Sequence, residues 1–321
     1  MYYNPKTGFS GINDLVRKSG LKKNEVEDFL NQQETYTLHK PARKNFDTRR
    51  VFVHYIDQQW QADLVEMIPY EKDNNGFRYL LTVIDCFSKY AWSIPIHYKR
   101  GKDIVKAFNK IFKIRSNDPD SNIRGRKPSK IQTDLGKEFY NKDVQQLFKE
   151  NNIIHFSTHS NYKASIVERF NRTLKEKMWK YFTNKRISEK QTYKWIDILD
   201  DLMYNYNNSY HSSIKMTPVE ASKKENLQQV DDNLFSNKKV IVKKPKFKIG
   251  DLVRINKYKS IFAKGYLPNY TKEVFVIDEI IKSNKNKKIV EPVITYKIKA
   301  LNGEEILGIF YEKELVLFKK D

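Results

Sequence analysis

The order of apolar runs between residues 57 and 220 most constrains what this chain can fold into. Three consecutive runs bounded by turn residues predict an antiparallel meander, at 60–68, 77–85 and 90–96. Helical and strand patterns then alternate, with helices expected at 101–114, 141–151, 164–182 and 189–208 and short strands ending at Asp134 and Phe156. The segment is therefore expected to form one mixed α/β layer structure.

Three strands, a helix, a strand, a helix, a strand and a helix is the order of the RNase H-like α/β fold, which we expect for a core over 51–220. Residues 1–50 predict a small helical hairpin and a basic linker, with a helix-turn-helix as the alternative reading of the hairpin. Residues 221–246 are rich in Lys, Asn and Gln and predict a linker. Residues 247–321 are β-rich and predict a small all-β SH3-like or chromo-like barrel.

The charge of the chain points to a long anionic partner. Sixty Lys and Arg against 39 Asp and Glu give a formal net charge of +21, and every predicted segment is basic. Neutralising phosphates releases condensed counterions, so double-stranded DNA is the expected partner; an anionic membrane surface or simple solubility are the alternatives. Cys86 is the only cysteine, which excludes a zinc site that needs several thiolates. Without an apolar run long enough for a bilayer, we expect a soluble intracellular protein with no membrane partner.

Two aspartates fall on neighbouring strands of the expected sheet. Period-two alternation puts Asp63 on one face with Val65 and Met67, where an ionised carboxylate needs a salt bridge or a metal ion to compensate for burial. Asp134 ends the fourth strand, which lies beside the first in this topology. Two adjacent carboxylates repel one another unless a cation lies between them.

A third acid begins the long helix expected at 164–182. Glu168, Arg172, Lys175 and Trp179 recur at spacings of four, three and four on one helix face, which alone would also suit a solvated surface. Three oxygen ligands from separate elements suit Mg²⁺ or Mn²⁺. Two such ions about 3.5 to 4 Å apart can stabilise both the attacking and the leaving oxygen in phosphoryl transfer.

Four strings in order resemble the core of retroviral-type integrases: QADL at 61–64, YLLTVIDCFSKYAW at 79–92, TDLGKEF at 133–139 and KASIVERFNRTLK at 163–175. The chain is most similar to integrases of Maverick/Polinton transposons and related virophage-like elements. The resemblance implies that Asp63, Asp134 and Glu168 are the catalytic acids, which hold the metal ions, and that Arg172 and Lys175 bind the donor DNA end. It also implies trimming of the element's 3′ ends, strand transfer into target DNA, and a homo-oligomer.

The sequence departs from that family in two places. The spacing between Asp134 and Glu168 is slightly shorter than in retroviral enzymes, which indicates a shorter loop or helix. Retroviral integrases also carry an N-terminal zinc module with two His and two Cys, which this chain cannot build. The hairpin at 8–33 must therefore be stabilised without zinc.

Several further residues have two readings each. Lys163 precedes Glu168 and is expected either to contact DNA or to be an ordinary loop lysine, and His155 and His159 are expected to be structural. Four aromatic residues of the C-terminal segment, Phe262, Tyr266, Tyr270 and Phe275, could form a cage for a methylated lysine of chromatin or simply the barrel core. The lysine-rich run at 238–246 suits nuclear import or DNA contact. We expect the nucleus of a eukaryotic host, or a virion if the chain is virus-encoded.

Three functions remain open on the sequence alone. The first is an active integrase, a metal-dependent DDE polynucleotidyl transferase. The second is a domesticated DNA- or chromatin-binding protein without chemistry, and the third is an RNase H-like nuclease that does not join strands. The presence of all three acids favours the first, because a protein without chemistry would be free to lose them.

Overall fold

The computed structural model describes residues 1–6, 8–43, 46, 51–114, 125–157, 164–188, 192–235, 244–257, 266–281 and 293–320. The chain divides into two compact units. One unit is Val51–Lys239, and the other combines Met1–Arg50 with Val240–Asp321. None of the described helices is both long enough and apolar enough to span a membrane.

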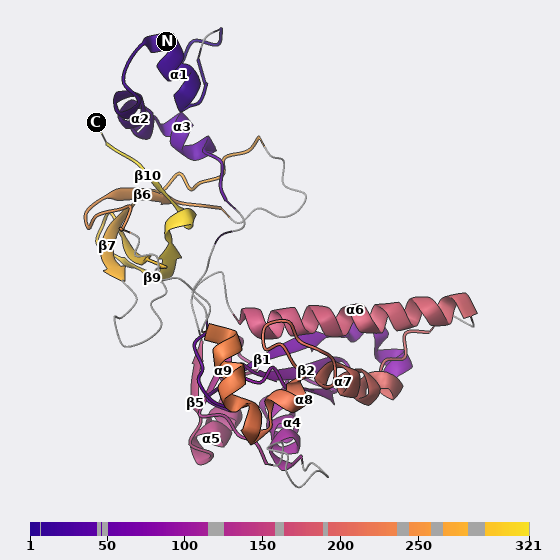
Figure 1. Ribbon diagram of the computed structural model, residues 1–321. Helices are drawn as coiled ribbons and strands as arrows, with labels where there is room; N and C mark the ends of the chain where they lie inside the picture. The colour runs from indigo at the N-terminus through magenta and orange to yellow at the C-terminus, as the bar shows by residue number, and fades with distance from the viewer. Residues whose placement is uncertain are drawn as a thin grey trace. The chain divides into compact units, whose positions relative to one another are not determined.

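The Val51–Lys239 unit is built on a five-stranded mixed sheet with the order β3-β2-β1-β4-β5 (Figure 1). Its strands are β1 (Gln59–Glu66), β2 (Tyr79–Asp85), β3 (Ala91–Ile96), β4 (Lys130–Thr133) and β5 (Ile154–Ser157). The first three are antiparallel neighbours, as the meander predicted. β4 runs parallel to β1, with Trp60 opposite Ile131, and also parallel to β5. The expected neighbourhood of the first and fourth strands is confirmed, and the topology is that of the RNase H-like core.

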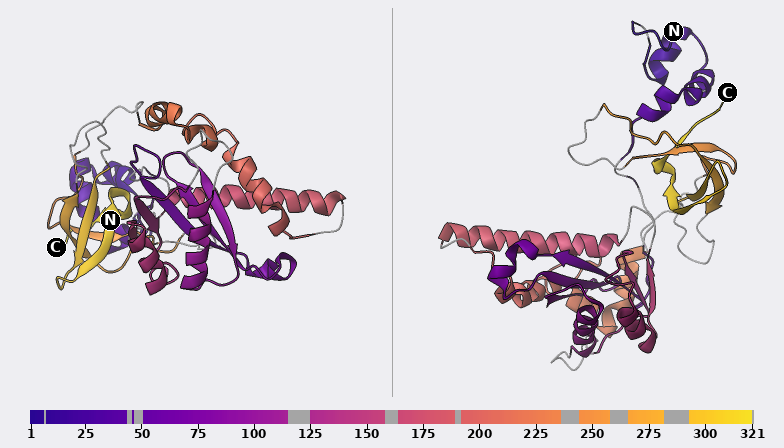
Figure 2. Two further views of the ribbon diagram at one scale, coloured as in Figure 1. Left: turned by 90° about the horizontal axis from the view of Figure 1, so that it is seen from below. Right: turned by 180° about the vertical axis from the view of Figure 1, so that it is seen from behind.

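Helices cover both faces of this sheet because each strand buries alternate residues on opposite sides. Trp60 and Ala62 of β1 pack with α4 (Gly101–Lys113) and α5 (Lys142–Glu150). Val65, two residues beyond Asp63, packs instead with α6 (Ser165–Ser188) and α7 (Leu199–Asn207). Figures 1 and 2 show α6 on one face of the sheet and α4 on the other. The side of β1 that carries Asp63 therefore faces α6.

Three boundaries differ from the sequence prediction. β1 ends at Glu66, because a 3₁₀ helix (Ile68–Asn74) begins at the next residue but one and Pro69 cannot donate to a strand ladder. The long helix continues to Ser188, well past residue 182. Of the helix expected at 189–208, residues 189–191 lie outside the described residues, 192–195 are not helical, and a 3₁₀ turn at Ile196–Ile198 leads into α7.

The segment expected to be a linker at 221–246 is helical over much of its first half. It follows α8 (Pro218–Ala221) and contains a 3₁₀ turn at Lys224–Asn226 and α9 (Leu227–Phe235). Val230 of α9 is fully buried, and Leu227 and Leu234 pack against the same cluster. These three residues share one helix face, a pattern that the polar composition of the segment concealed.

Among its described residues, the other unit contains three short α-helices, one more than predicted, and an antiparallel sheet. The helices are α1 (Ile12–Ser19), α2 (Lys23–Gln32) and α3 (Glu34–His39), and α3 occupies part of the expected linker. The sheet has the order β10-β6-β7-β8-β9, with β6 (Leu252–Ile255), β7 (Phe275–Ile281), β8 (Thr295–Ala300), β9 (Glu305–Tyr311) and β10 (Leu315–Leu317). This sheet fits a barrel-like domain, although no pairing between described residues closes β9 onto β10.

The two ends of the chain fold together in this unit. The backbone carbonyl of Leu38 accepts hydrogen bonds from the amides of Asn269, at 2.8 Å, and Tyr270, at 3.2 Å. Lys319 makes an ion pair with Asp28 of α2 at 2.8 Å. The N-terminal helices are therefore stabilised in part by hydrogen bonds and an ion pair with the β-sheet segment.

The C-terminal aromatic residues favour the core reading over the cage reading. Tyr270 and Phe275 are 4% and 8% exposed, and Phe275 belongs to the hydrophobic core of the sheet. Tyr266 is exposed, whereas Phe262 lies outside the described residues. Two of the four rings are thus unavailable to a ligand in this arrangement.

Candidate active site

Gln61 joins β1 to the start of α6. Its side-chain Oε1 accepts hydrogen bonds from the backbone amides of Ile166, at 2.9 Å, and Val167, at 3.0 Å. Amides in the first turn of a helix have no partner within the helix, so this side chain caps α6. Gln61 Nε2 also donates to Gln132 Oε1 of β4 at 3.0 Å. One buried amide thus fixes the first turn of α6, which carries Glu168, against the two central strands.

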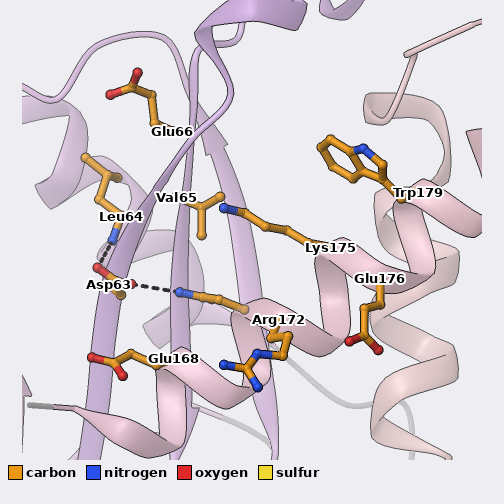
Figure 3. Close-up of a pocket in the computed structure, with 10 residues that line it drawn as sticks. Asp63, Leu64, Val65, Glu66, Glu168, Arg172, Lys175, Glu176 and Trp179 are labelled. Carbon is orange, nitrogen blue, oxygen red and sulfur yellow. Dashed lines mark hydrogen bonds between the residues drawn. The ribbon is translucent and has the colours of Figure 1, made fainter. Parts of the chain in front are cut away.

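Asp63 lies two residues further along the same face of β1. It is half-buried, and its carboxylate accepts hydrogen bonds from the backbone amide of Leu64 and from Asn171 Nδ2, both at 2.8 Å (Figure 3). Burial raises the pKa of Asp63, and the negative charge of Asp134 raises it further; the two hydrogen bonds and the charge of Lys175 oppose the shift. A carboxylate under these influences gains stability from a nearby cation.

Asp134 directly follows β4 and is held by its neighbours. Its carboxylate accepts a hydrogen bond from the Gly136 amide at 3.0 Å. Its backbone carbonyl accepts from the hydroxyls of Thr133, at 2.7 Å, and Ser157, at 2.9 Å. These bonds fix the chain as it leaves the parallel strands, at a place where the charge of Asp134 acts on Asp63.

A groove of about 530 Å³ runs between β1 and α6. Its lining contains Asp63 and Glu168 at one end and the basic residues of α6 beside them (Figure 3): Asp63, Leu64, Val65, Glu66, Glu168, Asn171, Arg172, Lys175, Glu176 and Trp179. The structure therefore brings together two of the three predicted acids and both predicted basic residues of the helix. Asp134 is linked to the groove through its electrostatic effect on Asp63 and is not part of the lining.

The residues at this groove fit a hard divalent cation. No three acidic, histidine or cysteine side chains in the described part of the chain already converge as a ligand set, so the carboxylates must turn toward a common point to bind one. Two observations favour such binding: Asp63 is a desolvated carboxylate close to a second negative charge, and Asn171 Oδ1 is buried with no hydrogen-bond partner among the described residues. Carboxylate and amide oxygens are the ligand types that Mg²⁺ and Mn²⁺ take.

Known proteins resemble this chain in sequence and in fold. A family model described as the integrase core domain matches residues 55–164. A transposon-derived protein of Caenorhabditis elegans is 32% identical over 232 residues, which cover 72% of this chain and 73% of that protein. The chain belongs to the integrase core-domain family.

A relative of lower identity and a solved structure also resemble this chain. A retrovirus-related Pol polyprotein from transposon 412 of Drosophila melanogaster is 26% identical over 195 residues, which are 60% of this chain but only 14% of the polyprotein. A solved structure of a simian T-cell lymphotropic virus intasome, in complex with a PP2A regulatory subunit, matches with a TM-score of 0.58 at 15% identity. That match covers 97% of this chain and 95% of the other, and it supports a shared fold.

Three further residues of the core were singled out in the sequence, and the structure describes one of them. Lys163 and His159 lie outside the described residues. His155 of β5 is bonded on both ring nitrogens, to Thr133 Oγ1 at 2.8 Å and to Gln145 Nε2 at 2.7 Å. Burial lowers the pKa of His155 to about 4, so the ring is neutral at physiological pH. These contacts support the structural role expected for His155.

Sequence reasoning missed two polar residues that organise the integrase core. Gln61 shares the strand face of Asp63 by the period of two, and Asn171 follows Glu168 by three residues on the helix face that meets β1. Both are buried, at 0% and 7% exposure, and buried amides need hydrogen-bond partners. Their spacing from the two acids was the available signal.

A buried ion network supports the other end of the central strands. Arg126 is 2% exposed and bonds both Asp57, at 2.7 Å, and Asp85, at 2.8 Å. Arg126 also lies over the Trp92 ring, with its guanidinium carbon 5.0 Å from the ring centroid. Because Asp85 ends β2 and Arg126 precedes β4, the network links strands that flank β1.

Proposed function

We propose that this chain is a DDE-type integrase that trims the 3′ ends of a mobile DNA element and joins them to target DNA. The observation that carries the proposal is the meeting of Asp63 and Glu168 at one groove, with Asp134 directly after the adjacent strand β4, in a chain of the integrase core-domain family. The resemblance to Maverick/Polinton integrases supplies the type of element.

Asp63, Asp134 and Glu168 would hold Mg²⁺ or Mn²⁺, two ions in this proposal, which when bound supply Lewis-acid stabilisation of the reacting phosphate and activation of the attacking oxygen. Other residues of the chain hold the acids in position. Asn171 donates to Asp63 and keeps the carboxylate facing the groove. Gln61 keeps the first turn of α6, and so Glu168, beside β1.

The basic residues of the groove supply the DNA contacts in this proposal. Arg172 and Lys175 lie on α6 next to the acids, and Lys163 precedes that helix in the sequence. A phosphate between the acids would be within reach of both helix side chains, whose positive charges offset its own. Two DNA ends must be joined to one target, so we propose a homo-oligomer that acts in the nucleus. The β-rich segment, as an SH3-like barrel, is the proposed contact with chromatin or DNA.

The test is a joining reaction with the purified full chain. Labelled DNA carrying the end sequence of the encoding element is incubated with a target plasmid and Mg²⁺ or Mn²⁺. Joined products support the integrase. Cleavage without joining would indicate a nuclease, and binding without either would indicate a domesticated binding protein.

A matched pair of variants ties the reaction to the site. Asp63→Asn removes a charge from the groove and should abolish both trimming and joining. Asp200→Asn, an exposed aspartate of α7 away from the groove lining, should react like wild type. Joining by Asp63→Asn at the wild-type rate would overturn the site assignment.

A further inference from the structure

The groove at the acids continues along α6. A second hollow, of about 470 Å³, adjoins it, and its lining among the described residues comes from α6: Glu176, Trp179, Lys180, Thr183 and Asn184. Glu176 and Trp179 line both hollows. One open surface therefore follows the helix from the proposed site of the reacting phosphate to Asn184, and Trp179 stands where the two hollows meet.

Trp179 is exposed and yet held in place. Its side chain is 38% exposed. It meets the ring of Tyr70 edge to face at 5.6 Å, and that of Phe182 at 5.6 Å, and Tyr70 in turn packs on Tyr193 at 5.1 Å. A large aromatic ring that is fixed by other rings and open to solvent among charged residues offers a preformed surface for stacking. A ring that served only the hydrophobic core would instead be covered.

The position of Trp179 suits a strand that starts at the acids. Trp179 follows Glu168 by eleven residues, or roughly 16 Å along the helix at about 1.5 Å per residue. Stacked nucleotides advance by about 3.4 Å each, so the distance corresponds to about four or five nucleotides. Lys175 and Lys180 lie on either side of Trp179 in the two hollows, where their charges suit a phosphate backbone. Lys175 and Trp179 extend from α6 on the side that faces β1 (Figure 3).

We infer that Trp179 is a stacking platform for an unpaired base of the DNA end, about four or five nucleotides from the reacting phosphate. The inference rests on the proposed function and deepens it. A base inside a duplex has both faces covered by its neighbours, whereas an unpaired base four or five nucleotides into an overhang can offer a free face to the indole. Trimming the 3′ strand of a duplex end leaves the complementary strand unpaired, which supplies such a segment at this place.

The test compares two DNA probes by fluorescence anisotropy, without metal so that no cleavage occurs. One probe is a blunt duplex, and the other carries an unpaired 5′ overhang of about six nucleotides, matched to the reach estimated above. Trp179→Leu retains an apolar cover for the aromatic cluster but removes the stacking face. It should weaken binding of the overhang probe at least about fivefold, the lower end for one base stack, and leave the blunt probe within about twofold.

Trp179→Phe keeps a smaller ring and should show an intermediate loss. Tyr204→Leu is the matched control, because Tyr204 is an exposed ring of α7, 73% accessible, that lines neither hollow. It should bind both probes like wild type. In wild-type protein, a 2-aminopurine placed at successive overhang positions should be quenched most strongly at about the fourth or fifth nucleotide.

The inference would be overturned if Trp179→Leu lost affinity equally for both probes or lost none for the overhang probe. It would also be overturned if 2-aminopurine quenching in the wild-type protein did not depend on position. Thermal melting of Trp179→Leu identifies a folding defect, in which case the wild-type quenching profile and Trp179→Phe decide. The joining reaction is scored separately. A wild-type chain that binds the overhang through Trp179 but never joins strands would refute the proposed integrase and keep the stacking site.

Discussion

Gln61→Leu is the most informative single substitution outside the acids. Leucine has nearly the volume of glutamine and fills the same space between β1 and α6, but it lacks the oxygen that accepts the hydrogen bonds at the start of α6. The amides of Ile166 and Val167 then lose their partner at the buried end of the helix. Gln132 Oε1 still accepts from Gln59 Nε2 at 3.2 Å, so the loss is confined to the helix end.

The magnitude follows from those two amides. A buried donor left without a partner costs about 1–3 kcal/mol, and removal of a helix N-cap costs about 0.5–2 kcal/mol. Because one of the two amides is only partly buried, we expect a total loss of about 2–4 kcal/mol in the free energy of unfolding. For a unit of this size, that lowers the melting midpoint by roughly 4–16 °C.

The assay is urea unfolding followed by circular dichroism, together with the joining reaction well below the melting midpoint. Gln59→Leu is the matched control, since it removes a single hydrogen bond on the same strand face and should cost less than about 1 kcal/mol. Gln61→Leu should also slow joining, because Glu168 lies in the turn that loses its cap. A stability loss no greater than that of Gln59→Leu would refute the capping role of Gln61.

The remaining predictions concern the ion network, the amide at the site and the titration of buried histidines. Arg126→Met leaves the buried Asp85 and the partly buried Asp57 without their ion-pair partner and should cost about 3–5 kcal/mol, read from the urea midpoint; a change below about 1 kcal/mol would contradict the network's role. Asn171→Leu should slow joining at least about tenfold with DNA affinity within about twofold, because the carboxylate of Asp63 loses its donor; equal losses in both would contradict a positioning role. Burial lowers the pKa of His155 and of His211 to about 4, so below pH 6.5 these two side chains bind more protons in the unfolded chain than in the folded one. Their contribution to stability should therefore be lost as the pH drops from about 7 toward 4, and His155→Gln should change the pH dependence of the melting midpoint in that direction; an unchanged pH dependence would contradict the assignment.

The sheet and the place of Asp63 could be predicted because they depend on short-range patterns. Alternation along β1 and the order of apolar runs decide the strand faces and the neighbourhood of β1 and β4. The same periodicity argument placed Glu168, Arg172 and Lys175 on one face of α6. These features require no knowledge of distant contacts.

Other features could not be predicted because they depend on tertiary contacts. α9 lies in a segment rich in Lys, Asn and Gln, and Val230 becomes a core residue only because the rest of the Val51–Lys239 unit provides a surface to cover it. α3 lies in a segment rich in polar and basic residues, and its end is fixed by hydrogen bonds from Asn269 and Tyr270, more than two hundred residues away in the sequence. The direction in which each carboxylate of the site points is likewise set by partners such as Asn171, which spacing alone does not specify.

The central claim is that Asp63, Asp134 and Glu168 act as one metal site. The most direct measurement is an anomalous difference map from crystals of the full chain soaked in Mn²⁺. The account predicts an anomalous peak for Mn²⁺ within coordination distance of carboxylate oxygens of both Asp63 and Asp134, with the Glu168 carboxylate next to the ion. Crystals of Asp63→Asn should show no peak at this place. A wild-type map with Mn²⁺ bound elsewhere and none between the two aspartates, from protein that joins DNA strands, would contradict it.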